Sequence, residues 1–181
     1  MKKGIAAVVL AGLLALVVGG AYINRRNQMA TKDQAVTAQW RQVDAFLQRR
    51  SDLIPNLLEA AKGYPGQESA VAEINKARTA QRAAQTPGDR IAANAELQDA
   101  LGAWLTEIGK DRQLQSNETF LQLQDELAGT ENRIAVESRR YNDLVQDYNG
   151  YISVFPNTIF SRWAGFQPNT AYFSIAKAPS N

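Results

Sequence analysis

Few side chains in this sequence could support chemistry, and their types narrow the possible reactions. Cysteine and histidine are both absent, which removes thiol nucleophiles, Cys/His metal sites and His-dependent triads. Asp143 and Asp147 stand one helical turn apart, a spacing that a carboxylate-driven hydrolase could use for acid/base catalysis. Nothing apolar surrounds this pair in the pattern, so a solvated helix face is the favoured interpretation.

Three polar residues fall within otherwise apolar helical stripes. Arg50 lies in the register of one helix, and Glu131 and Ser138 lie in the register of another. A charge in a helical core must be paired or it costs several kcal/mol. We therefore predict a structural ion pair between Arg50 and Glu131. Two alternatives are an Arg50 side chain that snorkels at the stripe's edge and a polar binding site inside the bundle.

The charge distribution gives no reason to expect a nucleic-acid partner. The formal net charge is +2, but the first 30 residues contain Lys2, Lys3, Arg25 and Arg26 and no acid. The remainder is slightly acidic, so no basic domain face is required. The sequence also predicts no catalytic residues, no bound metal and no cofactor, because it contains no phosphate loop and no nucleophile–base constellation.

The elements that position these residues begin with a charge-free apolar run from Gly4 to Ile23. Its length of about 20 residues matches the thickness of a bilayer core, and Tyr22 stands where an interfacial aromatic would. We expect an N-terminal transmembrane helix. A cleaved secretory signal is the alternative, because Lys2-Lys3 would suit its charged start. The expected domains are an anchor with its juxtamembrane segment (1–30) and a helical domain (31–181).

Beyond the anchor, apolar residues recur at helical spacing in four segments and nowhere alternate for long with the period of a strand. The first segment stops at Gly63-Tyr64-Pro65-Gly66 and the second at Thr86-Pro87-Gly88-Asp89. The fourth runs from near Ser116 to about Ser153. Short loops between such helices favour antiparallel neighbours. The predicted fold is all-α, with an elongated antiparallel four-helix bundle after the transmembrane helix.

Pro55 lies inside the first of these patterns and lacks the amide donor that a regular helix uses. We expect a kink there, and a restart of the helix capped by Ser51 or Asp52 is the alternative. The fourth pattern ends in two Tyr-Asn pairs one heptad apart, Tyr141-Asn142 and Tyr148-Asn149. Both tyrosines lie on the apolar stripe, so we expect them in the core with hydrogen-bonded hydroxyls.

The C-terminal tail is rich in aromatic residues, unlike a disordered segment. It follows Phe155-Pro156, which should end the fourth helix. We expect the tail to fold back onto the bundle, and an exposed patch for a partner or a bilayer surface is the alternative. The candidate interaction surface consists of Phe160, Trp163, Phe166, Tyr172 and Phe173.

At these positions the chain resembles the LemA family of bacterial membrane-anchored helical proteins. The segment Arg49-Arg50-Ser51-Asp52-Leu53-Ile54-Pro55-Asn56-Leu57, followed by Lys62-Gly63-Tyr64, is similar to the family's first signature. Thr130-Glu131-Asn132-Arg133-Ile134 and the two Tyr-Asn pairs resemble its second. Phe155-Pro156, Gly165-Phe166 and Tyr172-Phe173 resemble its ending. Gln67-Glu68 departs from the His-Glu that members often have after the Gly-Tyr.

The resemblance implies a single N-terminal membrane segment, a long helical bundle and no established enzymatic activity. It also implies an envelope context, with a neighbouring membrane protease among the possible partners. We therefore expect a non-enzymatic scaffold or interaction protein, anchored in the bacterial inner membrane with its bundle outside the cytoplasm. Its partners would be envelope proteins or copies of itself. Two alternatives are a lipid-proximal structural module that uses Arg25, Arg26 and Lys32, and a hydrolase based on Glu131 or on Asp143 and Asp147.

Overall fold

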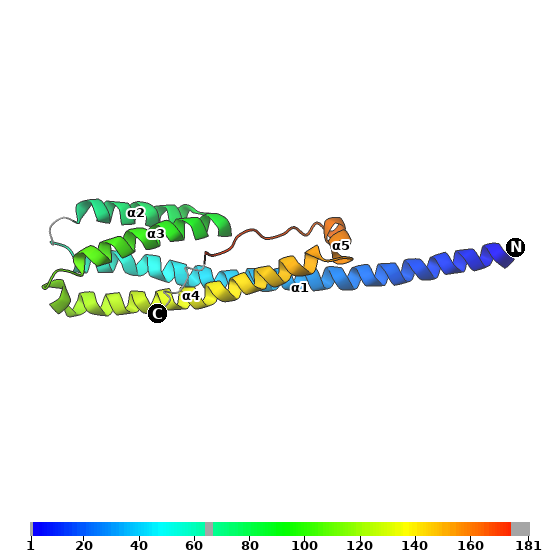
Figure 1. Ribbon diagram of the computed structural model, residues 1–181, viewed down its shortest axis with the longest axis horizontal. Helices are drawn as coiled ribbons and strands as arrows, with labels where there is room; N and C mark the ends of the chain where they lie inside the picture. The colour runs from blue at the N-terminus through cyan, green and yellow to red at the C-terminus, as the bar shows by residue number, and fades with distance from the viewer. Residues whose placement is uncertain (1, 64–66, 175–181) are drawn as a thin grey trace. The chain divides into compact units, whose positions relative to one another are not determined.

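The structure is a computed structural model that describes residues 2–63 and 67–174, with side chains from residue 10 onward. Within these ranges the chain is helical and contains no strand, which confirms the all-α prediction there (Figure 1). The helices are α1 (Lys2–Ala60), α2 (Glu68–Ala83), α3 (Pro87–Ile108), the short 3-10 helix η1 (Leu114–Ser116), α4 (Glu118–Ser153) and α5 (Asn157–Ala164).

Helix α1 is one uninterrupted helix of 59 residues that includes the expected anchor and passes through Pro55. A restart at Ser51 or Asp52 is therefore wrong, since α1 continues to Ala60. Among the residues that the structure describes, no helix is long and apolar enough to cross a membrane. The expected span includes residues 4–9, whose side chains lie outside that description, so it stays a prediction.

The helix boundaries follow from local chemistry. Thr86 caps α3, because its hydroxyl oxygen accepts a hydrogen bond from the Asp89 amide at 3.1 Å, and Pro87 occupies the first helical position. Two glycines adopt positive φ angles that other residues rarely take: Gly63 (96°) after α1 and Gly165 (78°) at the C-cap of α5. Of the predicted breaker at 63–66, residues 64–66 lie outside the described ranges.

The described chain forms two compact units. Of the described residues, 2–38 and 143–169 form the first, here called the anchor-side unit; 39–63, 67–142 and 170–174 form the second, here called the bundle unit. These units are defined by packing contacts within the chain. The predicted boundary at residue 30 instead separates a membrane anchor from a helical domain, and it stays a prediction.

The bundle unit packs parts of α1 and α4 with α2 and α3, and α2 lies against α3 (Figure 1). Helices α1 and α4 are antiparallel within this unit. Gln39 donates to Glu137 (2.7 Å) and Arg49 donates to Glu126 (2.8 Å), so the residue numbers of the contacting pairs rise along α1 as they fall along α4. Its core is a single apolar cluster around the fully buried Trp104. The other members are Ile54, Leu57, Ala61, Ile74, Ala77, Leu97, Leu101, Ile108, Leu114, Phe120 and Leu127.

The anchor-side unit has a smaller interior. Helix α1 buries Met29 and Val36 there, and α4 buries Val145, Tyr148 and Ile152. The two helices are again antiparallel, since Lys32 pairs with Asp147 and the Tyr151 hydroxyl donates to Gln28 at 2.6 Å. Burial in the described helices follows the helical spacing of the apolar residues. Helix α5 was not predicted, and it arises where the tail was expected only to fold back.

Candidate functional site: a polar layer and pocket in the bundle unit

The signature segment of α1 connects that helix to each of its neighbours in the bundle unit. Arg49 pairs with Glu126 of α4 at 2.8 Å, and Asp52 lies 3.4 Å from Arg82 of α2. Between them, Arg50 donates to Asn94 of α3 at 2.6 Å. Consecutive residues of a helix point in different directions, so one short segment can contact three helices. The signature segment, residues 49–57, is therefore a structural junction that joins α1 to the other three helices of the bundle unit.

Pro55 also has a role in this junction. A proline lacks the amide N–H that would bond the carbonyl four residues earlier, which here is that of Ser51. Arg78 of α2 donates its Nε–H to the Ser51 carbonyl at 2.7 Å. Ser51 is buried, so without Arg78 this carbonyl would lose the partner that buried acceptors require. The proline thus frees an acceptor that attaches α2 to α1.

Arg50 is 1% exposed and is one of the largest fully buried side chains. Its nearest partner is the side-chain oxygen of Asn94, at 2.6 Å, and this oxygen also accepts from Gln81 at 3.4 Å. Burial lowers the pKa of Arg50, and the negative charge of Glu131 opposes that shift. Arg50 remains charged, because an arginine guanidinium is not deprotonated in proteins.

The structure brings Arg50 and Glu131 together, with 4.0 Å between Nη1 and Oε1. This distance is at the limit of an ion pair, and the Glu131 side chain is 42% exposed. Arg50 is therefore held more directly by the Asn94 amide, a partner on α3 that the stripes on α1 and α4 did not indicate. Nε of Arg50 has no hydrogen-bond partner in the described structure.

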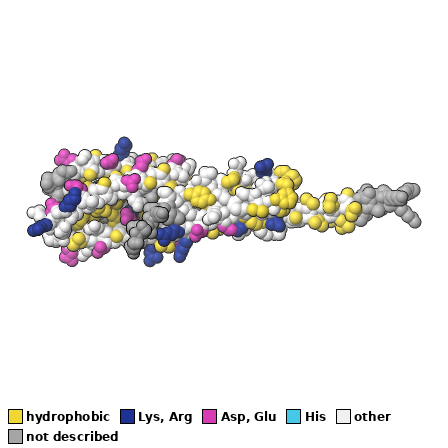
Figure 2. Space-filling model, viewed as in Figure 1, with side chains coloured by type: hydrophobic (Ala, Val, Ile, Leu, Met, Phe, Trp, Pro, Cys, Tyr) yellow, Lys and Arg dark blue, Asp and Glu magenta, His cyan; other side chains and the backbone are white. Residues whose placement is uncertain are grey.

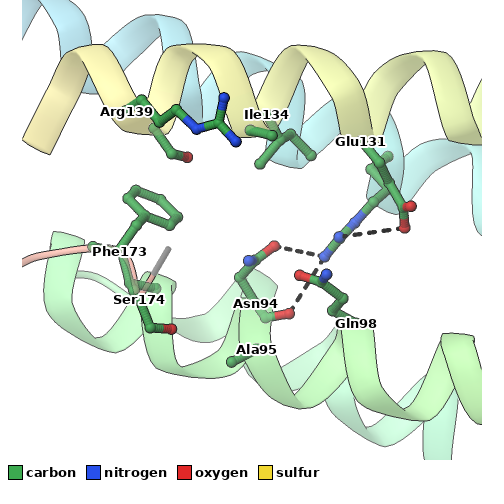
Figure 3. Close-up of a pocket in the computed structure, with 12 residues that line it drawn as sticks. Asn94, Ala95, Gln98, Glu131, Ile134, Arg139, Phe173 and Ser174 are labelled. Atoms are coloured by element: carbon green, nitrogen blue, oxygen red, sulfur yellow. Dashed lines mark hydrogen bonds and ion pairs between the residues drawn. The ribbon is translucent and has the colours of Figure 1, made fainter. Parts of the chain in front are cut away.

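Beside Arg50 lies a pocket of about 160 Å³. Figure 3 shows it between α3 and α4, with Arg139 and Phe173 toward one end and Asn94 and Glu131 toward the other. Ser138 also belongs to its lining. The alternative of a polar binding site inside the bundle therefore corresponds to a cavity in the structure.

The other carboxylate pair offers no comparable setting. Asp143 and Asp147 are both exposed on α4. Asp147 pairs with Lys32, whose ammonium group also lies 5.3 Å from the centre of the Tyr151 ring. The favoured interpretation, a solvated helix face, agrees with this placement.

The predicted aromatic surface is divided between the two units. In the anchor-side unit, Phe160 packs edge-on against Tyr22 (5.9 Å) and Trp163 (6.2 Å between ring centres), and Trp163 is 70% exposed. Phe166 is half-buried. In the bundle unit, Tyr172 is 42% exposed.

Phe173, by contrast, is buried against Trp40 and Tyr141. It is therefore a core residue and not an available surface.

The tail is held by the two asparagines of the Tyr-Asn pairs. Asn142 donates to the carbonyl of Phe173 (2.9 Å) and accepts from its amide (3.0 Å). Asn149 makes the same two contacts with Asn169, at 2.7 and 2.8 Å. Each amide side chain thus pairs with the backbone of one extended residue, as a neighbouring strand would. Sequence reasoning placed the tyrosines correctly but assigned the asparagines no role.

Tyr148 adds a third contact to the tail. Its hydroxyl donates to the Gln167 carbonyl at 2.9 Å, as expected for a core tyrosine. Burial raises the pKa of this hydroxyl, and the negative charge of Asp33 raises it further. The neutral, hydrogen-bonding form is therefore the stable one.

Together these features define a helical-bundle protein. Its interior contains a layer of buried, hydrogen-bonded polar residues, which are Arg50, Asn94 and Gln81. Among residues 10–63 and 67–174, no cluster of three acidic, His or Cys side chains could hold a metal ion. Residues 39–181 match the LemA family, and the chain belongs to that family. No curated protein matches the chain.

Proposed function

We propose that this protein is a non-enzymatic, membrane-anchored scaffold or interaction protein of the bacterial cell envelope. A single N-terminal span would hold the helical body close to the membrane. Tethering raises the local concentration of a protein, so even weak contacts with neighbouring membrane proteins or with other copies of itself become productive. The same proposal places the anchor in the inner membrane and the helical bundle outside the cytoplasm.

The exposed apolar surface of α1 supports the membrane anchor. The aliphatic Leu, Val and Ile side chains from residue 10 to residue 23 are between 47% and 73% exposed, whereas the rest of α1 buries one stripe. A helix that is apolar all round calls for an apolar surrounding. The exposed residues are Leu10, Leu13, Leu14, Leu16, Val17, Val18 and Ile23.

The position of α5 is the single observation that carries the lipid-proximal part of the proposal. Phe160 packs on Tyr22, where the apolar run ends, and this contact brings α5 to that level of α1. Helix α5 and the residues before it expose Val154 (61%), Phe155 (76%) and Trp163 (70%). Figure 2 shows hydrophobic side chains gathered in this region. Tryptophan beside the end of a span is typical of residues at a bilayer surface.

Basic side chains of the same unit fit this placement. Arg26 follows the apolar run, and Arg162 lies beside Trp163 on α5; both are exposed. Each arginine near an anionic membrane surface contributes about 1 kcal/mol of attraction. We therefore assign α5 and the start of the charged part of α1 to the headgroup region, as a collar around the emerging helix.

The test uses flotation with vesicles that contain anionic lipid. The full chain should float with the vesicles and resist salt extraction. A chain that begins at Asn24 should bind weakly and reversibly through the collar. In that shorter chain, Trp163→Ser should weaken binding about fivefold or more, and Arg25→Gln with Arg26→Gln should do so only when anionic lipid is present.

Val136→Ser is the matched control, because Val136 is also an exposed apolar residue (42%) but belongs to the bundle unit. It should leave vesicle binding unchanged. Failure of the full chain to float would refute the anchor. Equal binding by the Trp163 and Val136 variants would refute the collar while leaving the anchor intact.

A further inference from the structure

We propose that the pocket beside Arg50 is a binding site for a small organic monocarboxylate. The proposal concerns the bundle unit alone and does not depend on the membrane anchor. It rests on three observations: a cavity of suitable size, buried polar groups without partners at its wall, and a lining with one excess positive charge.

The cavity combines an apolar lining with a few polar groups, as small-molecule sites usually do. Ile91 of α3, Ile134 of α4 and Phe173 of the tail supply the apolar part. Phe173 is fixed there by the Asn142 contacts to its backbone and by its packing on Trp40 and Tyr141. Three separate parts of the chain therefore form a preorganised wall.

Two buried polar groups of the lining lack partners in the described structure. Nε of Arg50 and the Ser138 hydroxyl make no hydrogen bond, although Arg50 is 1% exposed and Ser138 5%. Leaving a buried polar group unpaired costs about 1–3 kcal/mol, and more for a charged group. These two atoms have almost no accessible surface, so a carboxylate in the cavity would offset this cost through its negative charge beside the buried guanidinium.

The charges of the lining select a monoanion. Arg50 and Arg139 are positive and Glu131 is negative, which leaves one excess positive charge. Arg139 is exposed, and Figure 3 shows its side chain reaching toward Ile134. A phosphate group carries about 1.5 to 2 negative charges at pH 7, so beside Glu131 it would leave excess negative charge. A carboxylate balances the site.

The cavity volume limits the size of the ligand. At about 160 Å³ it is close to the engineered cavity of about 150 Å³ that binds benzene. A ring or short branched chain would fill the apolar part and leave the carboxylate near the arginines. A molecule of this size should bind with an affinity in the millimolar to high-micromolar range.

The experiment uses calorimetric titration of the full chain, in a neutral detergent, with benzoate as the probe and benzamide as its uncharged counterpart. Benzoate should bind at one site, about tenfold or more tightly than benzamide. Arg139→Gln should weaken benzoate binding about tenfold and leave benzamide nearly unaffected. Ala95→Phe, which places a ring in the pocket from the exposed face of α3, should abolish binding of both.

Two matched variants separate the site from general effects. Arg140→Gln removes the neighbouring exposed charge, which pairs with Glu137 outside the pocket. Ala92→Phe adds a ring elsewhere on the exposed part of α3. Both should bind benzoate within about twofold of the unaltered chain. The proposal is overturned if benzoate does not bind, if benzamide binds equally well, or if Arg139→Gln and Ala95→Phe bind like their controls.

Discussion

At the scale of single residues, the most instructive side chains are Asn142 and Asn149. An asparagine amide has one acceptor and one donor arranged like those of a peptide group. On α4 each asparagine holds both the N–H and the C=O of one tail residue. Aspartate, serine or alanine could not reproduce both contacts, so the residue type is determined by the extended chain that it binds.

Exchanging Asn142 for aspartate should release the end of the tail. Asn142→Asp keeps an acceptor for the Phe173 amide but places a negative charge against the Phe173 carbonyl. We expect a loss of about 1–3 kcal/mol in the free energy of unfolding, measured by urea denaturation, with faster hydrogen exchange at the Phe173 amide. Asn132→Asp introduces the same charge at an exposed position of α4 and should change neither. Equal protection of the Phe173 amide from hydrogen exchange in both variants would show that the Asn142 side chain does not hold the tail.

The sequence predicted these residues only in part. Helical spacing placed Tyr141 and Tyr148 in the core, and the structure buries both. The asparagines next to them fall off the apolar stripe, where a polar residue needs no explanation. Their partners are backbone groups of Asn169 and Phe173, and backbone groups leave no signal in residue identity. Asn94 was missed similarly, because the predicted partner for Arg50 was sought among opposite charges.

At the scale of elements, Pro55 explains how α2 attaches to α1. The stripes and the breakers predicted four long helices with boundaries close to those observed. The stripe favoured a helix that continues through Pro55, as α1 does, but the sequence could not show that Arg78 would take the vacated acceptor of Ser51. That contact joins residues from two helices, and only tertiary packing brings them together.

A double-mutant cycle tests this exchange of donors. In the unaltered chain, Arg78→Gln should cost about 1–2 kcal/mol of unfolding free energy, because it leaves the Ser51 carbonyl unpaired. In the Pro55→Ala background the new backbone N–H can occupy that carbonyl, so the same change should cost less. We expect a coupling energy of about 1 kcal/mol, measured by chemical denaturation. Arg82→Gln, which alters a neighbouring exposed pair with Asp52, should show no coupling with Pro55→Ala.

At the scale of the whole molecule, both compact units are built from the same two long helices. Neither α1 nor α4 belongs to one unit alone. The LemA match begins at residue 39, yet residues 143–169 pack with the part of α1 that precedes it. The matched region therefore includes a segment whose packing partner lies outside the match.

Two shortened chains separate these contributions. A chain that begins at Asn24 keeps Met29 and Val36, the apolar side chains that α1 buries in the anchor-side unit. A chain that begins at Gln39 lacks them and exposes the facing side of α4, at a cost of several kcal/mol. We expect residues 143–169 to be cut rapidly by protease only in the second chain, as identified by mass spectrometry. Similar protection in both chains would show that this segment folds without α1.

The continuity of α1 has a consequence for how the chain can change in length. Its buried positions Met29, Val36, Val43, Leu47, Arg50 and Ile54 follow one another in steps of three, four or seven, across both units. One inserted residue between the units would rotate every earlier side chain by about 100° around the helix axis. Met29 would then face water and the smaller Ala30 would take its place. Only insertions of about a heptad would return Met29 to its buried position on the helix.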